Sequence, residues 1–131
     1  MKETEKYAIY RGGCHCGAIR FETRINNYQA IECNCSICHK KGFLHLIVSP
    51  ENFKLLKGKD FLTTYTFNTH TAKHTFCRVC GIHSFYIPRS DPNSIDVNLL
   101  CLDEDIIDRF EIKSFDGQNW EKNIHSIKSD D

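Results

Sequence analysis

The sequence has little proline, methionine and tryptophan, no excess charge of either sign and no long apolar run. Lysine plus arginine and aspartate plus glutamate number 17 each, so the formal net charge at pH 7 is zero. This balance argues against binding to nucleic acid or to a membrane surface through bulk charge. The longest apolar run, FLHLIV at 43–48, is interrupted by His45 and is far too short to span a bilayer.

The first residues also lack the features of a secretory leader. The segment MKETEKYAIY has no apolar core of signal-peptide length and no small-residue cleavage site. We therefore expect a soluble protein that is not secreted and that resides in the cytoplasm, with the nucleus as an alternative. The 131 residues have the size of one domain, 1–131, with no room for a second independent core.

Short segments rich in β-branched and aromatic residues dominate the chain, and several alternate apolar and polar side chains. Helix signals are weak: Ser49 and Pro50 predict a single turn over 49–53, and another turn is expected over 103–107. Residues 116–127 fit either a loop or a short helix. The sequence thus predicts a mainly β fold with little helix, with strands at 7–11, 18–23, 45–48, 63–67, 74–77, 84–87, 95–100 and 109–115.

Eight cysteines are many for a protein in a reducing compartment, and they fall into four groups: Cys14-x-Cys16, Cys33-x-Cys35-x2-Cys38, Cys77-x2-Cys80 and the single Cys101. In Cys-x-x-Cys a tight turn points both thiolates at one ion, and a following glycine, here Gly81, lets that turn close. In Cys-x-Cys an extended chain would place both sulfurs on one face and the intervening side chain on the other.

The two close pairs together supply a complete tetrahedral site made of Cys14, Cys16, Cys77 and Cys80. An all-thiolate site of this kind suits zinc and normally serves folding. The remaining cluster of Cys33, Cys35 and Cys38 offers three thiolates and an open fourth position, which is the pattern of a catalytic zinc.

Three alternatives stay open on spacing alone. Eight cysteines can in principle form four disulfides, and Cys33, Cys35 and Cys38 with one further thiolate could hold an iron–sulfur cluster. Cys101 could also close a second structural zinc site. His39 follows Cys38 directly and is either a proton carrier near the open site or a solvated histidine.

Four sequence motifs carry a resemblance to a known family: GGCHCGAIRFE, CNCSICHKKG, TFCRVCGIHSFYIPRS and VNLLCLD. The chain resembles the glutathione-dependent formaldehyde-activating enzyme family from about residue 9 to residue 120. Within that family, FKLLKG, TTYTFNTHTAKHTFC and NWEK are most similar to the branch of animal centromere protein V. The long basic, proline-rich N-terminal extension of the vertebrate centromere protein has no counterpart in this sequence.

The resemblance implies a Mss4-like fold, in which small coiled antiparallel sheets are organised around zinc and which a chaperone of Rab GTPases shares. It implies two zinc ions, with Cys14, Cys16, Cys77 and Cys80 at the structural site and Cys33, Cys35 and Cys38 at the catalytic site. It also implies a carbon–sulfur lyase that adds glutathione to formaldehyde, giving S-(hydroxymethyl)glutathione. The expected partners are therefore a small thiol and an aldehyde.

Glutathione carries two carboxylates, so its pocket should offer at least one cation. Lys40 and Lys41 follow the three-cysteine cluster, and Arg78 lies inside CRVC, so these three residues are the candidates. The competing function is a non-catalytic zinc-stabilised module that binds a protein, as the Rab chaperone does, or that associates with cytoskeleton or chromatin. An open fourth position at the three-cysteine cluster favours the enzyme, and a closed one favours the module.

Overall fold

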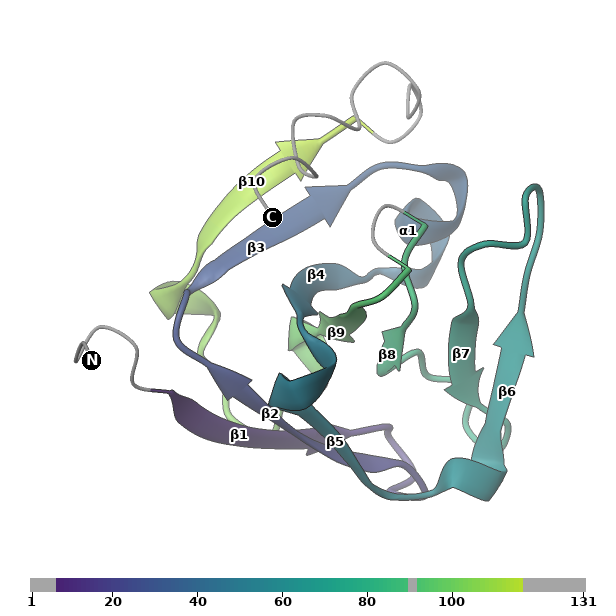
Figure 1. Cartoon of the computed structure of the whole chain (residues 1–131), viewed down its shortest axis with the longest axis horizontal. Coiled ribbons are helices and arrows are strands. Elements are labelled where there is room, and N and C mark those ends of the chain that lie inside the picture. Colours follow the sequence, from purple (N-terminus) through teal and green to yellow (C-terminus); the bar gives the residue numbers. More distant parts are fainter. Residues whose placement is uncertain (1–6, 90–91, 117–131) are drawn as a thin grey trace.

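The computed structural model describes residues 7–89 and 92–116. In these ranges ten short strands form three sheets, and the one α-helix, of six residues, lies beyond the end of strand β3 (Gln29–Cys33; Figure 1). The fold is therefore mainly β with little helix, which confirms the class predicted from the sequence. No helix in the described ranges is long and apolar enough to cross a membrane. Most of the segment 116–127, left undecided between loop and helix, lies outside these ranges.

The first sheet has three antiparallel strands in the order β1-β2-β5 and forms the lower layer in Figure 1: β1 (Ala8–Gly13), β2 (Arg20–Ile25) and β5 (Phe53–Lys57). Strand β2 alternates strictly, with Phe21, Thr23 and Ile25 buried. Because successive side chains of a strand point to opposite faces, this alternation turns one face of the sheet toward the core.

The second sheet has five strands in the order β10-β3-β4-β9-β8: β10 (Glu111–Phe115), β3 (Gln29–Cys33), β4 (Leu44–Val48), β9 (Ile95–Asn98) and β8 (Phe85–Tyr86). Strands β10 and β3 run parallel, and the other neighbours are antiparallel. The last described strand thus lies beside β3, so a segment late in the chain closes one edge of this sheet (Figure 1).

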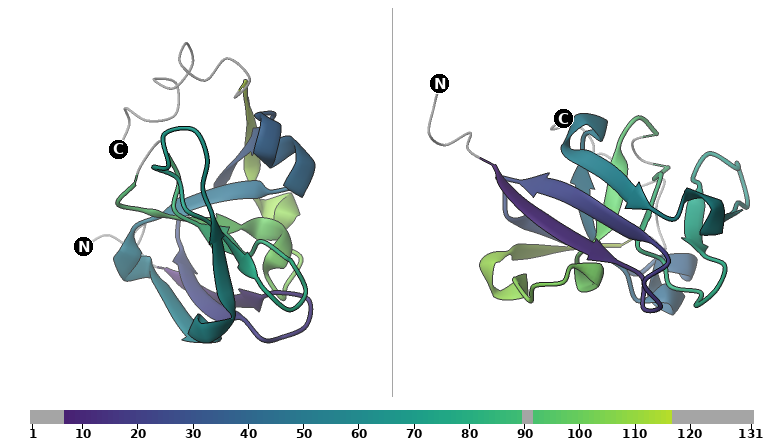
Figure 2. Two further views of the ribbon diagram at one scale, coloured as in Figure 1. Left: turned by 90° about the vertical axis from the view of Figure 1, so that its right-hand side faces the viewer. Right: turned by 90° about the horizontal axis from the view of Figure 1, so that it is seen from below.

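The third sheet is a hairpin of β6 (Leu62–Tyr65) and β7 (His74–Cys77). It faces the viewer in the left panel of Figure 2, and in Figure 1 its connecting loop reaches the level of the helix α1. Two residues of this loop, Asn68 and His70, have φ of 57° and 62°, which bends the loop tightly.

The helix α1 (Ser36–Lys41) lies within the three-cysteine motif, where the sequence predicted no helix. Cys35 caps its start, because the Cys35 sulfur accepts a hydrogen bond from the backbone N–H of Cys38. Gly42 ends it in the left-handed conformation with φ of 63°. Cysteine is not a usual N-cap residue, which is why the start of this helix was missed.

The core fills the space between the first sheet and one face of the second sheet. Phe21 of β2 is fully buried, and its ring centroid lies 5.5 Å from that of Phe53 and 6.2 Å from that of Phe85. Leu46 and Val97 pair directly across β4 and β9 on this same face. The apolar alternation of these strands therefore explains how the two sheets pack together.

The predicted strands all have counterparts, although several bounds differ. The segment 95–100 is a strand only to Asn98 and continues as a 3₁₀ turn. Two strands, β3 and β5, were not predicted. The described ranges contain four 3₁₀ turns: Pro50–Asn52, Lys59–Phe61, Leu99–Cys101 and Ile107–Arg109. The first confirms the turn expected at 49–53, and the last begins where the turn expected at 103–107 was to end.

Candidate metal centres and the adjoining cavity

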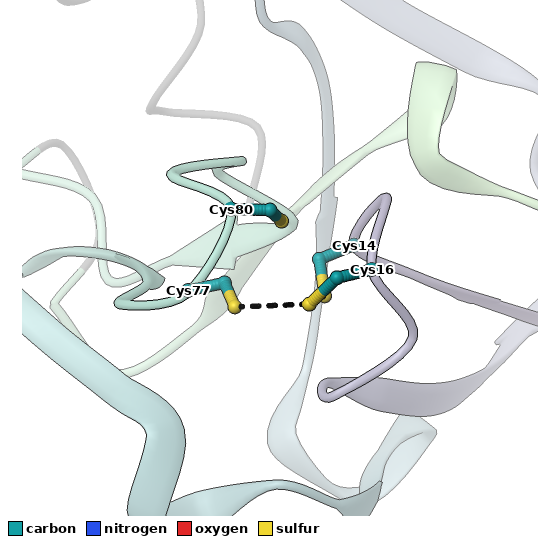
Figure 3. A group of neighbouring side chains, drawn as sticks. All are labelled: Cys14, Cys16, Cys77 and Cys80. Carbon is teal, nitrogen blue, oxygen red and sulfur yellow. Dashed lines mark hydrogen bonds between the residues drawn. The ribbon is translucent and has the colours of Figure 1, made fainter.

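A cluster of four cysteine sulfurs joins two turns that are far apart in the sequence (Figure 3). Cys14 and Cys16 lie in the turn between β1 and β2, while Cys77 ends β7 and Cys80 lies in the turn that follows. The Cys16 sulfur lies 3.7 Å from the sulfur of Cys14 and 3.7 Å from that of Cys77. We call these four residues the four-cysteine cluster.

Both turns are shaped by a glycine and by backbone hydrogen bonds to sulfur. Gly17 and Gly81 follow the two cysteine pairs with φ of 84° and 82°, a conformation that favours glycine. The N–H groups of Ile19 and Val79 donate to the sulfurs of Cys14 and Cys77 at 3.3 Å each. The Cys-x-Cys pair lies in a turn, so the expected extended chain is wrong, although its two sulfurs do face one site.

The sulfur–sulfur distances of 3.7 Å distinguish a metal site from a disulfide in the four-cysteine cluster. A disulfide bond is about 2.05 Å long, and all eight cysteines, each within the described ranges, are free. Four sulfurs bound at about 2.3 Å to one tetrahedral zinc ion lie about 3.8 Å apart. The donor set therefore fits a tetrahedral thiophilic metal ion, and the disulfide alternative is removed.

The second group of sulfurs consists of Cys33, Cys35 and Cys38, which we call the triad, and its sulfurs lie within 4.8 Å of one another. Cys33 ends β3, Cys35 caps α1 and Cys38 lies in its first turn, so one short strand–helix connection positions all three. The N–H groups of Cys35 and Cys38 donate to the sulfurs of Cys33 and Cys35 at 3.5 and 3.4 Å. Backbone donors of this kind stabilise thiolates.

Close contact among the three thiols of the triad shifts their pKa values apart. The side-chain hydrogen bond with Cys33, followed by that with Cys38, lowers the pKa of Cys35 to about 2. The same contact with Cys35 raises the pKa of Cys33 to about 11, and the pKa of the buried Cys38 is raised as well. Because a divalent cation supplies the charge that three neighbouring thiolates require, the triad also fits a metal ion.

A cavity of about 430 Å³ adjoins the triad, which is within the usual range of ligand pockets. The face of the five-stranded sheet that is turned away from the core lines it. Residues paired across strands share a face, and the residues of this face are Phe115, Cys33, Ile31, His45, Ile47, Asp96 and Tyr86. The loop of the β6–β7 hairpin adds Phe67, Asn68 and Thr69.

A buried polar pair lies on this sheet face. His45 Nδ1 is 2.7 Å from Asp96 Oδ2, and the two side chains are only 5% and 2% exposed. The Tyr86 hydroxyl lies 3.5 Å from the same nitrogen. The other nitrogen, His45 Nε2, is buried and has no hydrogen-bond partner among the described residues. Buried polar atoms are rarely left unpaired, so this nitrogen requires an explanation.

Aromatic rings continue from Tyr86 toward the hairpin loop. The ring centroids of His74 and Tyr86 lie 4.8 Å apart and those of Phe67 and His74 5.5 Å apart, both stacked. The Lys41 ammonium is 3.1 Å from His74 Nδ1 and lies 4.1 Å from the centroid of the Tyr86 ring. Burial and then the Lys41 charge lower the pKa of His74 to about 4.

None of the three cations predicted from the sequence lines this cavity. Lys41 is packed beneath its aromatic wall, and Lys40 is exposed on α1, so neither lines the cavity. Arg78 lies over the Phe61 ring, with its guanidinium carbon 5.1 Å from the centroid, and is likewise outside. Arg89 does line the cavity and was not among the candidates.

No fourth cysteine, histidine or carboxylate in the described part of the chain joins the triad. The Cys101 thiol donates to the His83 carbonyl at 3.7 Å and lines a separate hollow beside Cys14. Both a zinc site closed by Cys101 and an iron–sulfur cluster need a fourth cysteine beside the triad, and the described residues supply none. His39 is exposed on α1 and does not line the cavity.

Sequence reasoning missed His45, Asp96 and Arg89. A signal was present for the first two, because each is a polar residue inside a short apolar strand segment, FLHLIV and IDVNLL. Such interruptions are expected where a strand faces a site rather than the core. Arg89 follows a strand in a loop, and nothing in its sequence context distinguishes it from a surface arginine.

The chain is similar in sequence and in fold to known proteins. A family model described as "Glutathione-dependent formaldehyde-activating enzyme" matches residues 9–120. A crystal structure of a Rhodobacter sphaeroides protein, determined in structural genomics, superimposes with a TM-score of 0.72 at 35% sequence identity. The match covers 80% of this chain and 99% of the Rhodobacter chain.

Proposed function

Because the chain belongs to the glutathione-dependent formaldehyde-activating enzyme family, we propose that it is a metal-dependent enzyme of the carbon–sulfur lyase type. It joins the thiol of glutathione to formaldehyde or a similar small electrophile. The observation that supports this proposal most is the triad, which borders a cavity and has no fourth protein ligand among the described residues. Three protein ligands and one exchangeable position are typical of catalytic zinc sites.

We propose two zinc ions, one in each cysteine group. A zinc ion in the triad would lower the pKa of a thiol that binds it, so that the thiol is present as the more nucleophilic thiolate at neutral pH. The chain itself supplies the orientation: the triad fixes where the sulfur lies, and the apolar cavity walls hold the electrophile beside it and limit water. The four-cysteine cluster would stabilise the fold.

The glutathione carboxylates need a cation, and we assign this role to Arg89. Its side chain lines the cavity, whereas those of Lys40, Lys41 and Arg78 do not. A guanidinium presents paired donors that match a carboxylate. Within the family, we propose that the chain is most similar to the animal centromere protein V branch, on the basis of FKLLKG, TTYTFNTHTAKHTFC and NWEK.

The test measures formation of S-(hydroxymethyl)glutathione by NMR, as the rate above that of the spontaneous reaction at the same concentrations. The metal-loaded protein should accelerate the reaction, and removal of metal by a chelator should return the rate to the spontaneous value. Equal rates with and without the metal-loaded protein would contradict the proposal and favour the protein-binding module.

A spectroscopic test addresses the open position directly. In protein loaded with cobalt in place of zinc, added glutathione should increase the intensity of sulfur-to-metal charge-transfer absorption, because one more thiolate joins the metal. The same addition to the Cys35→Ser variant should produce no such change. An unchanged wild-type spectrum at saturating glutathione would show that the thiol does not bind there.

A further inference from the structure

The strongest unexplained feature of the cavity is His45 Nε2, which has no hydrogen-bond partner among the residues that the structure describes. We propose that His45 is a catalytic residue that carries a proton between the substrate thiol and the substrate oxygen, and that Asp96 holds it in position. This inference rests on the proposed carbon–sulfur chemistry and adds to it a residue and a proton path.

The geometry fixes which nitrogen is available. The Asp96 carboxylate lies 2.7 Å from His45 Nδ1, so Nδ1–H donates to it and the lone pair is left on Nε2. His45 and Asp96 are both buried, so both side chains are held inside the structure. Nε2 has no partner in the described ranges, and His45 lines the triad cavity. We infer that a ligand bound in that cavity supplies the missing partner of this nitrogen.

The strand register explains why these groups meet the triad. Ile31 pairs with His45, and Cys33, two residues further along β3, lies on the same face. Asp96 pairs with Ile47 on β4 and with Tyr86 on β8, again on this face. Because alternation in a strand has a period of two, the face that carries Cys33 also carries His45 and Asp96.

The Asp96 carboxylate stabilises a protonated His45 imidazole inside the protein. An isolated buried charge is costly, whereas an imidazolium hydrogen-bonded to a buried carboxylate is compensated. Seven titratable or charged groups face His45 or share its cavity: Cys33, Cys35, Cys38, His74, Tyr86, Arg89 and Asp96. Lys41 lies behind this wall, against His74 and Tyr86.

The proposed step balances without a further reactant. As glutathione binds, its S–H proton passes to His45 Nε2, and the resulting imidazolium is stabilised by Asp96. The sulfur electron pair then forms the bond to the carbonyl carbon of formaldehyde, and the C=O π pair moves to oxygen. That oxygen takes the proton back from Nε2, which restores the neutral imidazole and gives the hydroxymethyl product. The reverse reaction follows the same path.

A structural histidine would have the same burial and the same contact to Asp96, so the test must separate the two roles. We compare His45→Gln with His39→Gln, which removes an exposed histidine outside the cavity. His45→Gln should lower kcat for adduct formation by about 10²- to 10³-fold, while the KM for glutathione stays within about twofold and the metal content is unchanged. His39→Gln should match wild type in all three.

The pH profile gives a readout that a structural role would not move. Wild-type kcat/KM should fall on the acid side, because Nε2 that is already protonated cannot accept the thiol proton. His45→Gln should lose this limb over the pH range in which its metal content is constant. Asp96→Asn removes the carboxylate that positions His45 and stabilises the imidazolium, so it should lower kcat without changing the metal content. An unaltered limb in His45→Gln would overturn the inference.

A measurement on wild-type protein keeps the inference testable should His45→Gln not fold. Nitrogen-15 NMR of the imidazole should show a proton on Nδ1 and none on Nε2 in neutral protein, and the Nε2 resonance should shift when glutathione is added. A proton on Nε2, or no shift at saturating glutathione, would refute the assignment.

The activity measurements separate the two proposals. If wild type shows no rate above the spontaneous reaction, the proposed function itself fails. If wild type and His45→Gln are equally active, only the role of His45 fails.

Discussion

The two cysteine groups should differ sharply in what they contribute to stability, and Cys77→Ser compared with Cys35→Ser reveals this. A metal ion that links Cys16 to Cys77 closes a chain loop of 61 residues, whereas the triad spans only six positions. If a metal link restricts the unfolded chain as a disulfide does, the longer loop contributes about 4 kcal/mol and the shorter about 2 kcal/mol.

The burial of the two residues widens this difference. Cys77 is fully buried at the junction of the core and the cluster, and Cys35 is only partly buried at the start of α1. We expect Cys35→Ser to remain folded, to retain about one metal ion and to lose about 2 kcal/mol at most. Cys77→Ser should lose at least about 4 kcal/mol, which is a large part of the roughly 5–15 kcal/mol by which domains are stable.

The assay combines metal analysis with urea unfolding followed by circular dichroism. Cys16→Ser, which alters an exposed member of the same cluster, serves as the milder variant should Cys77→Ser not fold; it should lose the same metal ion and be clearly less stable than Cys35→Ser. Equal losses of stability in Cys35→Ser and the cluster variants would refute the division between a structural and a catalytic site.

Three further outcomes are expected. Gly58 has φ of 101° and an added Cβ would lie 2.1 Å from the Ala18 carbonyl oxygen, so Gly58→Ala should lower the free energy of unfolding by about 2–5 kcal/mol. Gly42→Ala, with open space around its Cβ, should lose only about 1–2 kcal/mol in the same urea titration, and equal losses would contradict the overlap. The pKa of His74 lies at about 4, below its ordinary 6.5, so the unfolded chain binds the extra proton between these values and stability falls as pH decreases. The stability advantage of wild type over His74→Gln should therefore shrink by up to about 3 kcal/mol from pH 7 to pH 4, and a constant difference would refute this cause. Arg89→Gln should raise the KM for glutathione about tenfold with little change in kcat, and Arg89→Lys should recover part of the lost affinity. The control Arg24→Gln, which changes an exposed arginine outside the cavity, should have no effect. A normal KM in Arg89→Gln would exclude the carboxylate contact.

The cysteine grouping could be predicted because the information is local. The spacing within Cys77-x2-Cys80 and the following Gly81 specify a turn, and the structure contains that turn. Pairing it with Cys14 and Cys16 required only the count of ligands that a tetrahedral ion needs. The grouping is confirmed as geometry, and the assignment of a role to each group remains a prediction.

The strands were predictable where β-branched and aromatic residues are concentrated, and less so elsewhere. Strand β3 reads QAIEC and β5 reads FKLLK, and both lack a clear alternation, so their formation depends on pairing with β4, β10 and β2. Propensity in strands depends strongly on such neighbours.

The cavity could not be predicted, because it depends on the register between strands distant in sequence. His45 and Asp96 are 51 residues apart and meet only through the pairing of β4 with β9. A shift of one residue would turn either side chain to the opposite face, and no local signal in the sequence sets that alignment.

The parallel pairing of β10 with β3 has a consequence during synthesis on the ribosome. Phe115 lies opposite Cys33 and closes the cavity wall, yet it is translated nearly 80 residues after the triad. At about 5–20 residues per second, the nascent triad thiols are exposed for roughly 4–16 s before that wall can form. During this interval metal ions and oxidants can reach the thiols without passing through the finished cavity.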